Sequence, residues 1–161
     1  MIPRDLMINA LRMRPDRIIV GESRGPEALD MLQAMNTGHD GSMTTMHANS
    51  PRDCFHRIET MVLMANMGLT EPVIRQQAAS AIQLVVQMAR FRDGSRKVSS
   101  VAEVIGINED GVALEEIFRF ERTGLDDARR VLGRFVATGY RPQFLGRLHA
   151  RGVEMPEQVF L

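Results

Sequence analysis

The sequence is poor in lysine, because Lys97 is the only lysine among its 161 residues. A phosphate-binding P-loop, G-x-x-x-x-G-K-S/T, needs a lysine to neutralise phosphate charge and glycines whose backbone amides cradle the phosphates. Lys97 instead follows Arg96 in a region predicted to form a β-turn. The sequence therefore contains no P-loop.

Cysteine is equally scarce. Cys54 is the only one, which excludes an internal disulfide and a zinc site made of several cysteines. Because Cys54 falls on the apolar face of a predicted helix, we expect a buried, inert thiol. The four histidines, at positions 39, 47, 56 and 149, include no pair with the i, i+4 spacing of a helical metal site. We assign no histidine to a metal.

Net charge and long apolar runs are also lacking. The formal net charge is zero, and no basic patch with interleaved aromatic residues is present, so the sequence predicts no nucleic-acid partner. Charged residues interrupt every apolar stretch, and no basic segment followed by an apolar one opens the chain, which predicts a cytoplasmic protein. The hydrophobic content of 44% is enough for one domain, or for one lobe with a small appendage.

Hydrophobic periodicity predicts a βαβ unit in the first third of the chain. After Pro26, apolar residues recur at i, i+3, i+4 and i+7, which is typical of a helix, and Gly38 closes it. The expected order is a helix at 5–14 ended by Pro15, a strand at 17–21, the helix after Pro26 and a strand at 42–46. Parallel strands joined by a helix end at the same sheet edge, so Glu22 and His47 should lie close together.

The rest of the chain predicts two helices followed by an antiparallel meander. Ser50-Pro51-Arg52-Asp53 is a helix start, and Thr70-Glu71-Pro72 opens a second helix through about Ser80. From Ile82 the period changes to two, and Asp93-Gly94 and Asp110-Gly111 supply turns between strands that reach about Phe120. Beyond Leu125 we expect a short Arg-rich helix, a turn at 139–142 and a final helix at 144–151. The fold class is α/β, with a core at 1–121 and a helical appendage at 122–161.

The residues suited to chemistry follow the two predicted parallel strands. Ligands of open α/β sheets bind beyond the carboxyl ends of the strands, where an acidic side chain is badly placed for packing. Glu22 could orient a magnesium-bound water or accept a proton from an attacking water. Arg24 and His47 could stabilise charge near a terminal phosphate. Taken alone, an acid after an apolar run is equally compatible with a structural role.

The amino-acid sequence of these segments resembles that of a known family. RMRPDRIIVGE, followed by TGHDGSMTTMHANSPRD, is similar to the Walker B and histidine boxes of the type II/type IV secretion ATPase superfamily. The resemblance is strongest to the CpaF-type tight-adherence (Flp) pilus assembly ATPases. It extends to about Phe120, roughly three quarters of the chain, and TGYRPQF in the tail is also reminiscent of the family. It implies the C-terminal part of a RecA-like P-loop NTPase core.

The resemblance also implies roles for individual residues. Glu22 matches the Walker B glutamate that acts on the hydrolytic water and Mg²⁺, and His47 matches the histidine that faces the nucleotide phosphate. Arg24 matches the arginine of the family's G-E-x-R segment, and Gly21 and Thr45 fall on the phosphate side. ATP and Mg²⁺ are the implied cofactors. The implied partners are ring neighbours in a homo-hexamer and platform proteins at the inner membrane, with the motor on its cytoplasmic side.

Two departures from the family pattern affect this interpretation. Ser23 stands where the family usually has an aliphatic residue, so we expect the strand end to be less well packed. The family's P-loop lies upstream of the Walker B strand, so the sequence resembles a truncated ATPase that is inactive alone. Two alternatives remain, a naturally short non-catalytic interaction subunit and an unrelated α/β phosphate-binding protein. Four arginines could act in trans across a ring interface, although a surface role suits each of them: Arg12, Arg14, Arg90 and Arg92.

Overall fold

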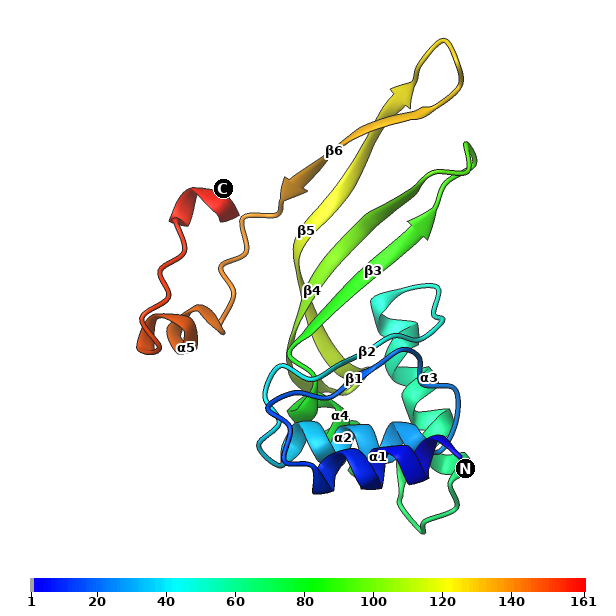
Figure 1. Cartoon of the computed structure of the whole chain (residues 1–161). Coiled ribbons are helices and arrows are strands. Elements are labelled where there is room, and N and C mark those ends of the chain that lie inside the picture. Colours follow the sequence, from blue (N-terminus) through cyan, green and yellow to red (C-terminus); the bar gives the residue numbers. More distant parts are fainter. Residues whose placement is uncertain (1) are drawn as a thin grey trace. The chain divides into compact units, whose positions relative to one another are not determined.

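A computed structural model describes residues 2–161, which form two compact units (Figure 1). The first unit contains the chain up to Ile82 together with residues 106–113, and the second contains 83–105 and 114–161. The predicted boundary after residue 121 falls inside strand β5 (Gly111–Leu125). The compact units therefore divide the chain at other positions than the sequence interpretation did.

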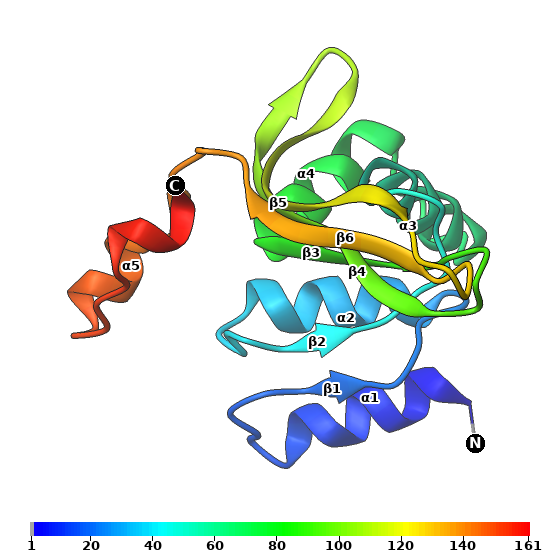
Figure 2. The ribbon, with the colours of Figure 1, turned by 90° about the horizontal axis from the view of Figure 1, so that it is seen from above.

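The first unit confirms the predicted βαβ arrangement. Strands β1 (Ile19–Val20) and β2 (Met43–Thr44) pair in parallel, with Ile19 opposite Met43, and helix α2 (Glu27–Asn36) joins them. Figure 2 shows the two strands side by side. Both strands are shorter than the periodicity predicted, with two residues each. Helix α2 ends before Gly38, whose φ of 95° suits the left-handed conformation expected after a helix.

The core of this βαβ unit lies between α2 and α1 (Pro3–Arg12). It is formed by buried Met7, Ile18, Met31 and Ala34, with Leu11, Val20 and Met35 packed against them. Helix α1 begins and ends two residues earlier than predicted, because Pro3 starts the first turn and the Asp5 carboxylate accepts a hydrogen bond from the Ile2 amide at 2.9 Å. After it, Arg14 has a φ of 51°, which ends the helical path before Pro15.

Helices α3 (Pro51–Met64) and α4 (Glu71–Ala81) complete the first unit. As predicted, the Ser50 hydroxyl caps α3, accepting a hydrogen bond from the Asp53 amide at 3.1 Å. Cys54 is buried on the predicted inner face of α3, and burial raises the pKa of its thiol to about 11. The expectation of a buried thiol is therefore confirmed.

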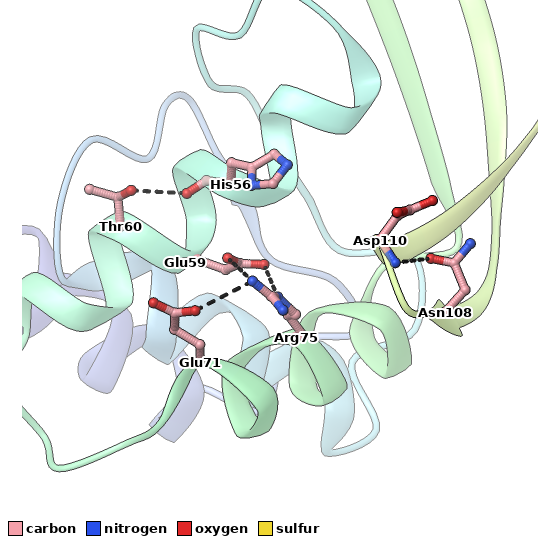
Figure 3. A network of polar contacts seen from close by, with 7 residues as sticks. All are labelled: His56, Glu59, Thr60, Glu71, Arg75, Asn108 and Asp110. Carbon is pink, nitrogen blue, oxygen red and sulfur yellow. Dashed lines mark hydrogen bonds and ion pairs between the residues drawn. The ribbon is translucent and has the colours of Figure 1, made fainter.

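A partly buried ion pair joins α3 to α4 (Figure 3). Arg75 of α4 donates from Nε to Glu59 Oε1 at 2.8 Å and from Nη2 to Glu59 Oε2 at 3.2 Å, and Glu71 lies 3.4 Å from Nη2. A bidentate arginine is one of the geometries that satisfies a buried carboxylate. The same view shows the β4–β5 turn, where Asn108 Oδ1 accepts a hydrogen bond from the Asp110 amide at 3.0 Å.

The second unit is built on a sheet with the strand order β3-β4-β5-β6. Its strands are β3 (Leu84–Arg90), β4 (Arg96–Asn108), β5 and β6 (Val131–Ala137), and both the β3–β4 and β5–β6 pairs are antiparallel. The predicted turn at Asp93-Gly94 is confirmed, with Gly94 at a φ of 82°. The alternating residues Leu84, Val86 and Met88 do form a strand, but they lie on its more exposed face.

The prediction of an Arg-rich helix beyond Leu125 is wrong. Residues 126–130 form a tight turn, in which the Arg130 amide donates to the Asp126 carboxylate at 2.7 Å and the Asp126 amide donates to the Arg130 carbonyl at 3.0 Å. Residues 131–137 then return as β6 along β5. The local arginines favoured a helix, but pairing with a distant strand satisfies the backbone instead.

The tail is anchored by a buried carboxylate. Glu103 of β4 accepts hydrogen bonds from the Tyr140 hydroxyl at 2.8 Å, the Gln143 amide at 2.8 Å and the Phe144 amide at 2.9 Å. Phe144 is the N-cap of α5 (Leu145–Ala150), which confirms the predicted final helix. A short 3₁₀ helix, η1 (Glu157–Phe160), follows, and the Phe160 ring stacks on Phe118 with a centroid distance of 5.8 Å.

Candidate functional site

The loops after β1 and β2 run side by side beyond the last strand residues. The Ser23 amide donates to the Thr45 carbonyl at 2.9 Å, and the Thr45 hydroxyl donates to the Gly21 carbonyl at 2.5 Å. These contacts extend the parallel pairing into the segments that carry Glu22 and His47. The two strand ends therefore lie at one edge, as the βαβ topology predicted.

Three predicted site residues meet at the Glu22 carboxylate. His47 Nε2 lies 3.1 Å from Glu22 Oε1, and Arg24 Nη2 lies 2.5 Å from Oε2. The Glu22 side chain is 22% exposed, against 72% for Arg24 and 81% for His47. The acid is thus less exposed than the two basic groups that contact its oxygens.

One oxygen of this carboxylate is left without a hydrogen bond. Glu22 Oε1 is buried and accepts none from residues 2–161, because His47 approaches it closely without the alignment of a hydrogen bond. Buried polar atoms are usually satisfied, and an exception at a site edge marks a place where water or a ligand can bind. Oε1 is therefore the atom of this site best suited to an additional donor.

The surrounding charges keep Glu22 ionised. The hydrogen bond from Arg24 is the largest influence and lowers the pKa of Glu22, and it outweighs the opposing effect of burial. The charges of Arg24, His47 and Arg57 lower this pKa further. The sequence interpretation missed Arg57, although it lies in the second turn of the helix that follows His47, where a basic residue can face the strand edge.

Glu27 is a second carboxylate that the sequence interpretation missed. It is buried, and its Oε1 accepts hydrogen bonds from the amides of Arg24 at 2.7 Å and Gly25 at 3.0 Å. Burial alone would raise the pKa of Glu27, but these backbone hydrogen bonds and one from its own amide lower it overall. Glu27 thus fixes the backbone of the loop that carries Arg24. An acid in the first turn of the predicted α2 was the available signal.

The two residues expected on the phosphate side lie beside Glu22. Gly21 is exposed, and a Cβ atom built on it would meet nothing within 4 Å, so open space adjoins its backbone. Thr45 is exposed as well, but the proton of its hydroxyl is already donated to Gly21. Neither position is blocked by another part of the first unit.

The expectation that Ser23 loosens the strand end is wrong. Ser23 is 1% exposed, and its hydroxyl lies 2.9 Å from the Thr44 hydroxyl. A buried hydroxyl with a hydrogen-bonding partner costs little, whereas an unpaired one would destabilise the strand end. The polar residue is therefore accommodated by a second hydroxyl on the neighbouring strand.

Other candidates belong to different parts of the protein. Lys97 lies over the Phe120 ring, 5.6 Å from its centroid, within the sheet of the second unit. A cavity of about 680 Å³ lies in the tail, where Leu145, Met155 and Phe160 are among its lining residues. None of Glu22, Arg24 and His47 lines that cavity. In residues 2–161 no helix combines the length and the apolar character needed to cross a bilayer.

Comparison with known proteins gives the family to which this α/β chain belongs. Residues 1–130 match the model of the type II/IV secretion system protein family, so the chain belongs to that family. The crystal structure of the VirB11 ATPase of the Brucella suis type IV secretion system, solved with sulphate, aligns with a TM-score of 0.60 and 34% identity. That alignment covers 64% of this chain and 32% of the other, and it supports the predicted RecA-like fold class.

Curated relatives include proteins of conjugation and type IV secretion. A putative conjugal transfer protein of Mycobacterium tuberculosis is 41% identical over 125 residues, which are 78% of this chain and 35% of the relative. The conjugal transfer protein TrbB of Rhizobium radiobacter is 36% identical, over 72% of this chain and 34% of the relative. VirB11 of Bartonella quintana is 37% identical, over 62% of this chain and 28% of the relative. The chain thus spans about a third of the length of these relatives.

Proposed function

We propose that this chain is the C-terminal part of an ATP-hydrolysing motor that powers pilus assembly or type II/IV secretion. The observation that carries the proposal is the Glu22 carboxylate, held between Arg24 and His47 with Oε1 free to accept a hydrogen bond. Membership of the secretion family and the likeness to a VirB11 ATPase support the same reaction class.

In this proposal Glu22 acts on the water that attacks the terminal phosphate. Its lowered pKa keeps the carboxylate ionised at neutral pH, and Oε1 can accept a proton or orient a metal-bound water. His47 and Arg24 would donate to the phosphate oxygens of a bound nucleotide, and the backbone at Gly21 and Thr45 would border the same side. When bound, Mg²⁺ and ATP would supply the electrophilic phosphorus and the neutralisation of its charge.

The residues present fit one side of a nucleotide site. An unpaired acidic oxygen beside two basic side chains suits a hydrated cation and a phosphate. The backbone cradle and lysine that hold the other phosphates are missing from this sequence. We therefore propose that a glycine-rich loop elsewhere in the complete protein closes the site, and that the 161-residue chain alone hydrolyses ATP negligibly.

The finer assignment is a CpaF-type tight-adherence pilus ATPase. Its support is the resemblance of the two boxes, whereas the relatives named for conjugal transfer and type IV secretion support the broader family. We propose a homo-hexameric ring on the cytoplasmic side of the inner membrane, bound to platform proteins of the machine, with no nucleic-acid partner. Any arginine that acts in trans would come from a neighbouring subunit of this ring.

A non-catalytic assembly subunit is the second candidate. It is favoured by the Arg24 guanidinium, which lies 2.5 Å from Glu22 Oε2 and occupies that oxygen. If that ion pair is permanent, the chain would retain the family's fold and subunit contacts without using nucleotide.

ATP turnover distinguishes the two candidates. It is measured for the 161-residue chain and for a polypeptide extended upstream through a glycine-rich loop, each with and without Glu22→Gln. The proposal expects turnover only in the extended protein, with a loss of at least about 100-fold in Glu22→Gln while nucleotide binding survives. Glu71→Gln removes an exposed carboxylate of α4 and serves as the matched control. Unchanged turnover in Glu22→Gln would refute the motor.

A further inference from the structure

Four residues connect the two strand ends directly behind the Glu22–His47 pair. We call Gly21, Ser23, Thr44 and Thr45 the hydroxyl brace. Its contacts are Ser23 N to the Thr45 carbonyl at 2.9 Å, Thr45 Oγ1 to the Gly21 carbonyl at 2.5 Å, and Ser23 Oγ to Thr44 Oγ1 at 2.9 Å. Both chain neighbours of Glu22 are therefore bound to Thr45, two residues before His47.

The hydroxyls of the brace can form a continuous chain of hydrogen bonds. The Thr44 hydroxyl is placed to donate to the Thr45 carbonyl at 3.3 Å. Either hydroxyl could donate in the Ser23–Thr44 pair, and with Thr44 donating to Thr45 the donor in that pair is Ser23. The chain of bonds runs from Ser23 through Thr44 to Thr45 and returns through the Ser23 amide. Successive hydrogen bonds polarise one another, so the brace holds more firmly than separate contacts would.

The brace lies on the inner side of the loop that carries the proposed chemistry. Ser23 is 1% exposed, whereas the residues on either side of it, Glu22 and Arg24, meet at the more exposed face. A change at Ser23 would therefore move the backbone beneath both charged groups. An aliphatic residue there would fill the space but could not bond to Thr44.

We infer that Ser23 and Thr44 are positioning residues, whose hydroxyl pair sets the approach of the Glu22 carboxylate to the His47 imidazole. This inference rests on the proposed function for its biological meaning. The geometry itself can be tested without nucleotide, because the charge of His47 helps to lower the pKa of Glu22. Replacing His47 should raise the pKa of Glu22 only while the brace holds the two groups together.

The experiment follows the Glu22 carboxyl by carbon NMR across pH in the 161-residue chain, with and without His47→Gln. In the wild type, His47→Gln should raise the pKa of Glu22. This rise in the pKa of Glu22 should be smaller or absent in Ser23→Ala and in Thr44→Val. The double variant should reduce the rise no further than either single variant does. Thr44→Ser keeps the hydroxyl and should restore the wild-type response.

A control separates positioning from general stability. Thr60→Val removes a hydroxyl that donates to the His56 carbonyl of α3 at 3.0 Å, away from the brace. It should leave the response of Glu22 to His47→Gln unchanged. A full response in both Ser23→Ala and Thr44→Val, with a loss of stability like that of Thr60→Val, would overturn the inference.

Turnover in the loop-containing polypeptide distinguishes this inference from the motor itself. Ser23→Ala should lower kcat roughly tenfold or more, with little change in KM, because the acid is displaced while the phosphate contacts remain. Suppose that the brace variants abolish the effect of His47→Gln on the pKa of Glu22, but that Glu22→Gln leaves turnover intact. The positioning role of the brace would then be supported, and the proposed function would be refuted.

Discussion

Arg24 Nη2 lies 2.5 Å from Glu22 Oε2, so an arginine two residues along the loop occupies one oxygen of the proposed catalytic acid. The other oxygen faces His47 and receives no hydrogen bond. Arg24 therefore has two possible partners in a complete motor, the acid and an incoming phosphate. Its side chain is 72% exposed, which leaves it room to exchange one for the other.

The first prediction concerns the protonation of Glu22. Arg24→Gln removes the largest influence that lowers the pKa of Glu22, so this pKa should rise. A carboxylate with a lowered folded-state pKa stabilises the protein above its unfolded-state pKa, and this contribution is lost as pH falls through the folded-state value. The variant should show a weaker acid dependence of stability. Carbon NMR of the carboxyl group measures the pKa directly, and Arg52→Gln, in the exposed first turn of α3, is the control.

The proximity of Glu22 and His47 was predictable because it depends on local patterns and one topological rule. A β-branched run, a helical stripe after Pro26 and a second short strand together predict parallel strands, and parallel strands place Glu22 and His47 at one edge. The Ser50 cap followed from its own sequence as well. Each of these inferences could be made from residues that are close in the sequence or belong to a recognisable motif.

Three of the failures involve partners distant in the sequence. Ser23 looked like a packing defect because Thr44, which satisfies its hydroxyl, is 21 residues away. The stretch after Leu125 looked helical because its pairing with β5 is invisible in local composition. Glu103 lies 37 residues from Tyr140, and nothing in the alternation of β4 shows that its carboxylate anchors the tail.

The second prediction concerns that anchor. Burial raises the pKa of Tyr140 to about 12, and the hydrogen bond to Glu103 adds to the effect. Tyr140 is the only tyrosine, so ultraviolet absorbance of the phenolate reports it alone. Glu103→Gln should lower the midpoint while leaving it above the ordinary value, because burial remains. Stability should fall as pH rises between about 10 and about 12 in the wild type, since the folded state favours the neutral phenol.

The same substitution should also destabilise the tail. An amide at position 103 cannot accept from all three donors, so the backbone N–H of Gln143 or Phe144 loses its partner, at a cost of about 1 kcal/mol. Urea denaturation measures this loss. Glu109→Gln, at the exposed β4–β5 turn, provides a comparison that should be nearly neutral. Equal stability of the two variants would show that Glu103 does not hold the tail.

The third prediction concerns Asp93, which connects the two hairpins of the sheet. Its Oδ2 accepts a hydrogen bond from the Val131 amide at 2.6 Å, and Oδ1 accepts from the Ser95 amide and hydroxyl. The bond from Val131 is the largest of the influences that lower the pKa of Asp93 to about 2. The wild type should therefore lose stability as pH falls from about 3.8 to about 2, and Asp93→Asn should lose less over that range. Thermal unfolding at a series of pH values measures both, and equal slopes would contradict the assignment.

The fourth prediction concerns Gly133 of β6, which pairs with Arg122 of β5. A Cβ atom at this position would collide with the Phe120 ring and would lie 2.5 Å from the Glu121 carbonyl oxygen, which belongs to the backbone and cannot swing away. Gly133→Ala should therefore cost roughly 1–3 kcal/mol, the usual penalty of overpacking. Gly124→Ala is the matched control in the same hairpin, because a Cβ there meets nothing within 4 Å and its φ is not left-handed. Chemical denaturation should show a lower free energy of unfolding for Gly133→Ala than for Gly124→Ala. Because the added methyl group disturbs the packing of β6 on β5, the Gly133→Ala protein should also exchange the amide protons of residues 131–137 faster than the Gly124→Ala protein.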